Sequence, residues 1–239
     1  MKNAKRTFNA IASAGVGYAL GEINSAYILG MRKGYDIRKK GTGNAGATNT
    51  MLLEGKLAGG FVMLFDMGKA VAAVKLCQKL FPDYISAGET AGTAAILGHM
   101  FPALLDFRGG KGLACIGGTI LALGDFPVMI SFATAVLLKT RYLCAVPISA
   151  SVFYPLYRGF TTRNWHGAAI LGTVAIPVFA KHLENLKRIQ ENRELKVDFL
   201  WNKEKELERT GLQEVSDMID RGEIPDKHPL PPMPASKEE

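Results

Sequence analysis

The chain of 239 residues has few of the residues that build metal centres or disulfide frameworks. Its three cysteines, Cys77, Cys115 and Cys144, each stand alone inside an apolar run. That spacing fits neither a zinc site nor a set of disulfides, so we expect core thiols and predict no metal and no cofactor. Zinc-finger spacing and the aromatic signature of RNA-binding modules are also lacking. We therefore predict no nucleic-acid partner, although the net charge is +7.

A cleavable signal sequence is not evident either. Residues 1–6 are basic and an apolar stretch follows them, but this stretch continues to about Gly30 without a convincing cleavage site. A signal peptide would end sooner, after a short apolar region and small residues. We predict a first membrane helix here.

Apolar residues are plentiful but unevenly distributed. They make up 48% of the chain, yet the mean hydropathy is only +0.08, because charged residues and prolines gather after Lys187. A helix needs about 20 residues to cross the hydrocarbon, and shorter ones can tilt or be buried among neighbours. The apolar segments are residues 8–30, 57–80, 85–105, 113–124, 126–138, 142–158 and 165–182.

This pattern predicts an all-α, polytopic membrane bundle with about seven crossings, five or six being the alternatives. We assign residues 1–195 to the membrane domain and residues 196–239 to a polar cytoplasmic tail. Within the tail we expect a helix over 207–219 and disorder from Ile224 onward.

The charge of the loops indicates an orientation. With the N-terminus outside, the basic residues of the inner loops outnumber those of the outer ones, in line with the positive-inside rule. The basic N-terminus argues for the opposite orientation. We predict that the polar motifs and the C-terminus face the cytoplasm from the cell membrane, with these basic residues on the inner loops: Arg32, Lys33, Arg38, Lys39, Lys40, Arg108, Lys111, Lys139 and Arg141.

The most informative motif is a glycine-lysine turn at the start of an apolar run. Residues 109–112 read Gly-Gly-Lys-Gly, Arg108 precedes them, and the apolar run begins at Leu113. Consecutive glycines let backbone N–H groups converge on an anion, and the N-terminus of a helix adds its dipole. We predict a phosphate site beside the membrane. A Walker loop is excluded, because no Ser or Thr follows Lys111.

Another motif spans residues 25–49. Residues 41–46 satisfy G-x-G-x-x-G, and Asp66 lies twenty residues beyond Gly46. A dinucleotide site needs a buried strand before the first glycine, whereas charged residues 36–40 stand there. That mixture of glycines with hydroxyl and amide side chains suits an oxygen-rich ligand. The simpler alternative is a small-residue turn between two helices.

A further motif, residues 181–189 followed by Glu194, lies where the last apolar run meets the tail. On a helix, His182 and Asn185 share one face. The alternative for His182 is a hydrogen-bonded interface residue, and His99 has the same alternative at the end of its helix.

Together these motifs resemble the acyl-phosphate:glycerol-3-phosphate acyltransferases of bacterial membranes, the PlsY family. The resemblance covers about residues 15–195. The first motif matches at Ser25, Asp36, Arg38, Gly41, Gly43, Asn44, Gly46, Thr48 and Asn49. The second matches at Gly98, His99, Pro102, Phe107, Gly109, Gly110, Lys111 and Gly112, and the third at Lys181, His182, Asn185, Leu186 and Arg188. Phe65, Asp66 and Lys69 resemble the family's F-D-x-x-K-G.

The resemblance implies a seven-helix enzyme that transfers an acyl chain from acyl phosphate to the sn-1 hydroxyl of glycerol 3-phosphate. The products would be lysophosphatidic acid and phosphate, in the first step of phospholipid synthesis. Membrane lipid and an enzyme that makes acyl phosphate would be its partners. The implied catalytic residues are Lys111, His182 and Asn185. The implied substrate-binding residues are Ser25, Arg38, Gly41, Thr42, Gly43, Asn44, Thr48, Asn49, His99, Gly109, Gly110, Gly112 and Arg188.

The sequence also bears on the acyl donor. The H-x-x-x-x-D pair of acyl-CoA-dependent acyltransferases is lacking, since Asp is not the fifth residue after His99, His166 or His182. No Gly-x-Ser-x-Gly elbow occurs. Acyl phosphate is a mixed anhydride with a good leaving group, so positioning and charge stabilisation can suffice.

Two features keep other functions open. Leu52 stands where the family has an arginine, which leaves a divergent member with another acceptor or no activity as an alternative. The charged pair Asp66 and Lys69 inside a membrane segment leaves a transporter of a phosphate-bearing solute as the second.

Overall fold

The computed structural model describes residues 2–210, together with residues 218 and 221. Within them the chain is helical, and the only strand-like pairing in this part is one antiparallel bridge between Tyr142 and Lys196. The all-α class is thereby confirmed. The α-helices are α1 (Lys2–Glu22), α2 (Ser25–Arg32), α3 (Ala47–Glu54), α4 (Lys56–Leu80), α5 (Ala87–Met100), α6 (Leu113–Leu123), α7 (Phe126–Thr140), α8 (Ala145–Thr162), α9 (Trp165–Gly172), α10 (Ala175–Gln190) and α11 (Lys203–Thr210). Short 3₁₀ turns cover Ile37–Lys39, Ala103–Leu105 and Val197–Leu200.

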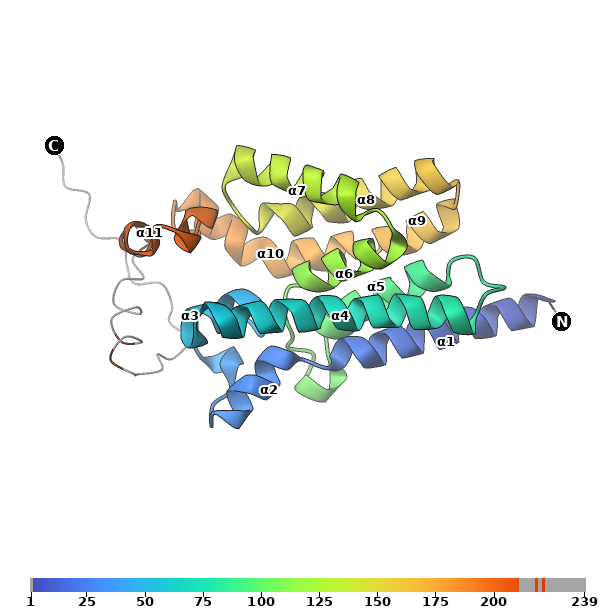
Figure 1. Cartoon of the computed structure of the whole chain (residues 1–239), viewed down its shortest axis with the longest axis horizontal. Helices are drawn as coiled ribbons and strands as arrows, with labels where there is room; N and C mark the ends of the chain where they lie inside the picture. Colours follow the sequence, from blue (N-terminus) through green and yellow to red (C-terminus); the bar gives the residue numbers. More distant parts are fainter. Residues whose placement is uncertain (1, 211–217, 219–220, 222–239) are drawn as a thin grey trace.

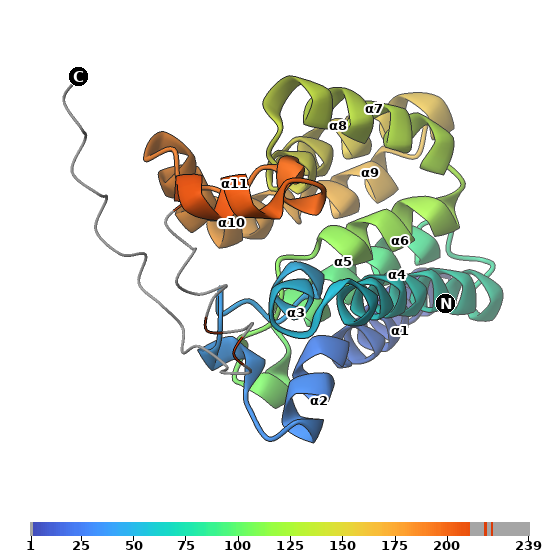
Figure 2. The ribbon, with the colours of Figure 1, turned by 60° about the vertical axis from the view of Figure 1, so that its left-hand side comes forward.

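The longer helices run along one axis of the molecule (Figure 1). The short helices α2, α3 and α11 gather at the end opposite the N-terminus. Figure 2 shows two layers, one formed by α1 to α6 and the other by α7 to α11. The chain therefore brings the α2–α3 loop, the α5–α6 loop and the end of α10 to the same end of the bundle.

Helices α1 and α5 pack backbone to backbone. A Cβ added at Gly17 would lie 2.2 Å from the carbonyl oxygen of Ala91, and one added at Gly21 would lie 2.3 Å from that of Ala95. Small residues permit such close approach between membrane helices. This contact fixes the end of α5, where His99 lies.

The first apolar segment differs from our expectation. We predicted one helix over 8–30, which is wrong, because the chain breaks at Ile23 and Asn24. The Asn24 side chain caps α2 by accepting from the N–H of Tyr27 at 2.8 Å, and its Nδ2 donates to the carbonyl of Ala45 at 3.1 Å. A polar cap buried inside an apolar run thus ends one helix and begins the next.

Two stretches, Lys56–Leu80 and Trp165–Gln190, are long and apolar enough to cross a membrane by length and composition. The second stretch covers α9 and α10 together. Helices α6 and α7 are shorter apolar helices. The count of about seven crossings stays a prediction.

The tail is helical from Lys203, four residues earlier than we expected. Leu207 of α11 is 1% exposed, so this helix packs onto the domain. Most of the helix predicted for 207–219, and the predicted disorder beyond it, lie outside the described residues.

Candidate functional site

The structure brings the three motifs together at one end of the bundle (Figure 1). The guanidinium of Arg38 donates to the carbonyl of Leu105 at 2.7 Å, which joins the first motif to the α5–α6 loop. Lys111 of that loop donates to the Asn185 amide oxygen on α10. The polar end of the bundle is therefore continuous across both layers.

A network of charged and amide groups surrounds Asn185. Its Nδ2 donates to Glu194 Oε1 at 2.5 Å, while Arg188 Nε donates to Glu194 Oε2 at 2.7 Å. Arg188 also donates to Glu184 at 2.8 Å. Burial, helped by the charge of Arg188, lowers the pKa of Lys111 from its ordinary value. Arg188 is already paired with Glu184 and Glu194, so the Lys111 ammonium is the stronger candidate for binding an anion.

His182 lies one turn before Asn185 on α10, and its side chain is buried. Its Nδ1 is 2.7 Å from the carbonyl oxygen of Val178, and this carbonyl can only accept, so Nδ1 carries the proton. The Nε2 lone pair is then left to accept from another group. No partner for Nε2 occurs within residues 2–210.

His99 belongs to a separate buried cluster with Asp66 and Lys69. The Lys69 ammonium lies 2.9 Å from Asp66 Oδ1 and 3.0 Å from His99 Nδ1, and it donates to the carbonyl of Ile23 at 2.7 Å. His99 Nδ1 also lies 3.6 Å from Asp66 Oδ1, so the three side chains form one buried cluster. The cluster joins the α1–α2 corner to α4 and α5. This contact gives the charged pair on α4 a structural role.

The glycine turn differs from our expectation in its hydrogen bonds. The N–H of Gly109 donates to Met100 O at 3.2 Å and that of Gly110 donates to His99 O at 3.1 Å, so both close the end of α5. Substrate binding by Gly109 and Gly110 stays a prediction, and their N–H groups do not support it, because both donate within the chain. The glycines permit close packing instead: a Cβ on Gly109 would lie 2.0 Å from His99 O, and one on Gly110 would lie 2.2 Å from His99 Nε2.

Amides without a partner in the helix occur at the start of α6. Gly112 has φ +88° and begins α6 without a side-chain cap. The first N–H groups of a helix have no partner within the helix. These amides and the Lys111 ammonium are therefore candidate donors for a phosphate.

Asn49 organises the first motif from inside. Its side chain is fully buried, and Nδ2 donates to the carbonyls of Ile37 at 3.1 Å and Lys40 at 3.0 Å. Its Oδ1 accepts from the N–H of Thr42 at 2.8 Å. A Cβ on Gly41 would lie 2.5 Å from that oxygen. With both amide protons used, Asn49 shapes the loop and has no donor left for a substrate.

Arg38 is also engaged within the protein. Its Nε and terminal nitrogen donate to Asp36 at distances between 2.7 and 3.1 Å, and the guanidinium lies 4.8 Å from the Tyr27 ring centroid. Hydrogen bonding from Arg38 lowers the pKa of Asp36. Phosphate binding by Arg38 stays a prediction, and its charge is compensated as the protein stands.

The other predicted ligands of the first motif differ in exposure. The Ser25 hydroxyl is buried and has no partner among the described residues, so it is free to bind a water or a substrate group. Thr48 is exposed, Thr42 and Asn44 are half-buried, and the Asn44 N–H lies 3.4 Å from Thr42 Oγ1. Gly43 has φ +70°, which favours glycine.

We did not predict roles for Asn24, Lys69 and Glu194 in the site. Asn24 stands directly before Ser25, and Glu194 follows the third motif, so position in the motifs was the available signal. Leu52, which stands where the family has an arginine, is buried on α3, with 7% of its surface exposed.

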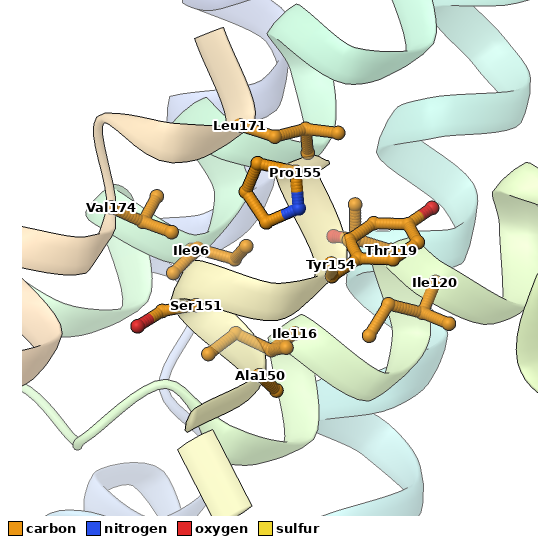
Figure 3. A pocket seen from close by; sticks show the side chains of 10 residues that line it. All are labelled: Ile96, Ile116, Thr119, Ile120, Ala150, Ser151, Tyr154, Pro155, Leu171 and Val174. Carbon is orange, nitrogen blue, oxygen red and sulfur yellow. The ribbon is translucent and has the colours of Figure 1, made fainter. Parts of the chain in front are cut away.

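A separate cavity lies deeper in the bundle (Figure 3). It measures about 20 Å³ and is lined mainly by apolar side chains, among them Ile96, Ile116, Tyr154 and Val174. Such a volume holds about one water molecule. It is too small for an acyl chain and is lined by none of the predicted site residues.

The family model described as glycerol-3-phosphate acyltransferase matches residues 11–192. The chain belongs to this family. It is similar to the glycerol-3-phosphate acyltransferase of Legionella pneumophila (strain Corby), with 36% identity over 188 residues, 77% of this chain and 67% of the relative. It is also similar to that of Coxiella burnetii (strain CbuG_Q212), with 34% identity over 190 residues, 78% of this chain and 97% of the relative.

Two solved structures share the family's fold. One is PlsY, an integral membrane glycerol 3-phosphate acyltransferase, in its glycerol 3-phosphate form, with a TM-score of 0.66 and 30% identity over 80% of this chain and 96% of that one. The lysophosphatidic acid form gives a TM-score of 0.64 and 29% identity, over 78% and 94%. These matches confirm the family we inferred from the motifs and its integral membrane character. All three motifs up to Arg188 lie within the matched region.

Proposed function

We propose that this chain transfers an acyl group from acyl phosphate to the sn-1 hydroxyl of glycerol 3-phosphate. The products are lysophosphatidic acid and inorganic phosphate. The observation that carries the proposal is the meeting of Lys111 with Asn185, because it places cationic and amide donors from both layers at one point. Membership of the acyltransferase family supports the same reaction.

The proposed chemistry uses these groups for positioning and charge stabilisation. Lys111, Arg188 and the amides at the start of α6 hold substrate phosphate. His182 Nε2 accepts a hydrogen bond from the attacking hydroxyl and orients it. The hydroxyl oxygen attacks the acyl carbonyl carbon, the bond from that carbon to the phosphate oxygen breaks, and the departing phosphate takes the proton.

We further propose about seven membrane crossings with the site on the cytoplasmic side. Arg32 at the end of α2 and the loop residues Lys33, Arg108 and Arg141 lie at the site end. The N-terminal positive charge at the other end is partly compensated, since Lys5 forms an ion pair with Asp83 at 2.6 Å. That pair weakens the objection from the basic N-terminus.

The identity of the acyl donor tests the proposed function against transfer from acyl-CoA. Purified protein in lipid nanodiscs should form lysophosphatidic acid from glycerol 3-phosphate with acyl phosphate, and not with acyl-CoA. An enzyme that makes acyl phosphate would then act upstream. Activity with acyl-CoA alone would overturn the donor and the mechanism. An active transfer to another acceptor, with none to glycerol 3-phosphate, would favour the divergent member that Leu52 left open.

A further inference from the structure

The segment that follows the family's matched region is fastened to the site end of the molecule. The N–H of Val197 donates to the Arg141 carbonyl at 2.8 Å, next to the bridge between Tyr142 and Lys196. Lys56, at the start of α4, donates to the Leu200 carbonyl at 3.1 Å. This extension thus contacts both layers of the bundle beside the site.

Arg209 of α11 contacts the turn that ends α10. One terminal nitrogen donates to Asn192 O at 2.6 Å and the other donates to Glu194 O at 2.6 Å. Glu206 holds the guanidinium from behind, at 2.7 and 3.1 Å. Arg209 therefore spans the carbonyls on both sides of Arg193. A planar guanidinium presents its donors in fixed directions, so it reaches both carbonyls and the Glu206 carboxylate at once, an arrangement that the single nitrogen of a lysine does not reproduce.

The turn that Arg209 holds ends α10. Asn192 has φ +53°, in the left-handed region that asparagine adopts at helix ends, and the N–H of Arg193 donates to Arg188 O at 2.7 Å. The Asn192 side chain Oδ1 also accepts from Arg209, at 3.2 Å. Arg209 thus adds contacts from α11 to a turn that its own backbone closes.

The turn carries Glu194 into the site. From there the Glu194 carboxylate binds Asn185 at 2.5 Å and Arg188 at 2.7 Å. We infer that Arg209, which lies outside the 11–192 region matched by the family, is a positioning residue for the phosphate-binding groups on α10. This inference rests on the proposed function.

The experiment compares Arg209→Ala with wild type in the full chain, in nanodiscs of phosphatidylethanolamine and phosphatidylglycerol. Without Arg209, the turn no longer holds Glu194 in place, and Arg188, which Glu194 binds, shifts with it. The KM for glycerol 3-phosphate should therefore rise roughly tenfold with kcat little changed. Lys205→Ala is the matched control, because Lys205 is exposed on the same helix and has the same charge. Its KM should stay within about twofold of wild type.

Arg209→Lys keeps the charge but lacks the fixed fork of donors, so its KM should fall between those of wild type and Arg209→Ala. An unchanged KM in both variants overturns the inference. So does a fall in kcat at constant KM, or failure of both variants to fold, since each assigns Arg209 a structural role alone. Wild-type protein without any turnover overturns the proposed function itself, and is thereby distinguished from these results.

Discussion

The ammonium of Lys111 donates a hydrogen bond to the amide oxygen of Asn185, so a loop of one helical layer meets a helix of the other. An ammonium has three protons, and this contact uses one of them. The remaining protons can serve a phosphate oxygen. The site therefore depends on how the two layers are held together, as well as on the residues within each motif.

Lys111→Ala should lower kcat/KM by roughly a hundredfold or more, because it removes a preorganised cation from the place where phosphate binds. Arg108→Ala is the control, since Arg108 is an exposed cation in the same loop. Arg108→Ala should unfold at the wild-type temperature, and Lys111→Ala somewhat below it, because the buried Asn185 oxygen loses its donor. Near-normal turnover by Lys111→Ala would remove Lys111 from the mechanism.

The same lysine predicts a pH dependence. Burial and Arg188 lower the pKa of Lys111 from 10.5, so the ammonium loses its proton at a lower pH than a free lysine. The kcat/KM for glycerol 3-phosphate, which reports the free enzyme, should therefore fall as the pH rises through this lowered pKa. In Lys111→Arg the alkaline fall should move to higher pH, because arginine stays charged. If kcat/KM fell at the same alkaline pH in wild type and in Lys111→Arg, a group other than Lys111 would cause the fall.

Gly110→Ala should destabilise the protein by about 1–3 kcal/mol, because the added methyl group would collide with the His99 ring and force the turn to shift. Activity should fall with it. Gly117→Ala on α6 is the control, since the nearest atom to its added Cβ is Met67 Cε at 3.9 Å. Thermal unfolding in detergent measures the difference, and equal melting temperatures would contradict the close packing of this turn against His99.

The cluster around Lys69 predicts a stability effect that a second substitution relieves. Lys69→Met removes the lysine from the buried Asp66 carboxylate, leaves only His99 at 3.6 Å beside it, and should cost about 3 kcal/mol. The double variant Asp66→Asn, Lys69→Met removes the charge as well and should recover part of that loss. Lys79→Met, on the exposed part of the same helix, is the control. A double variant no more stable than Lys69→Met would show that the pair's charge does not matter.

The gathering of the motifs could be predicted from sequence, whereas the use of individual groups could not. Lys111, His182 and Asn185 come from loops and helix faces that the order of apolar segments already brings to one end. By contrast, the hydrogen-bond partner of the Gly110 N–H is the carbonyl oxygen of His99, so it depends on where α5 ends.

Other differences have the same kind of cause. Asn24 interrupts an apolar run that reads as one helix, and only its partners in space, Tyr27 and Ala45, explain the break. Arg209 belongs to a charged tail without a motif, so its contacts with Asn192 and Glu194 become visible only in the fold.

The central claim is tested most directly by following both products of one reaction. Purified protein in nanodiscs is given acyl phosphate and labelled glycerol 3-phosphate, and lysophosphatidic acid and inorganic phosphate are measured together. We expect the two products in equal amounts from wild type and a loss of both in Lys111→Ala. Phosphate release without lysophosphatidic acid, or no reaction with a folded wild-type protein, would contradict acyl transfer to glycerol 3-phosphate.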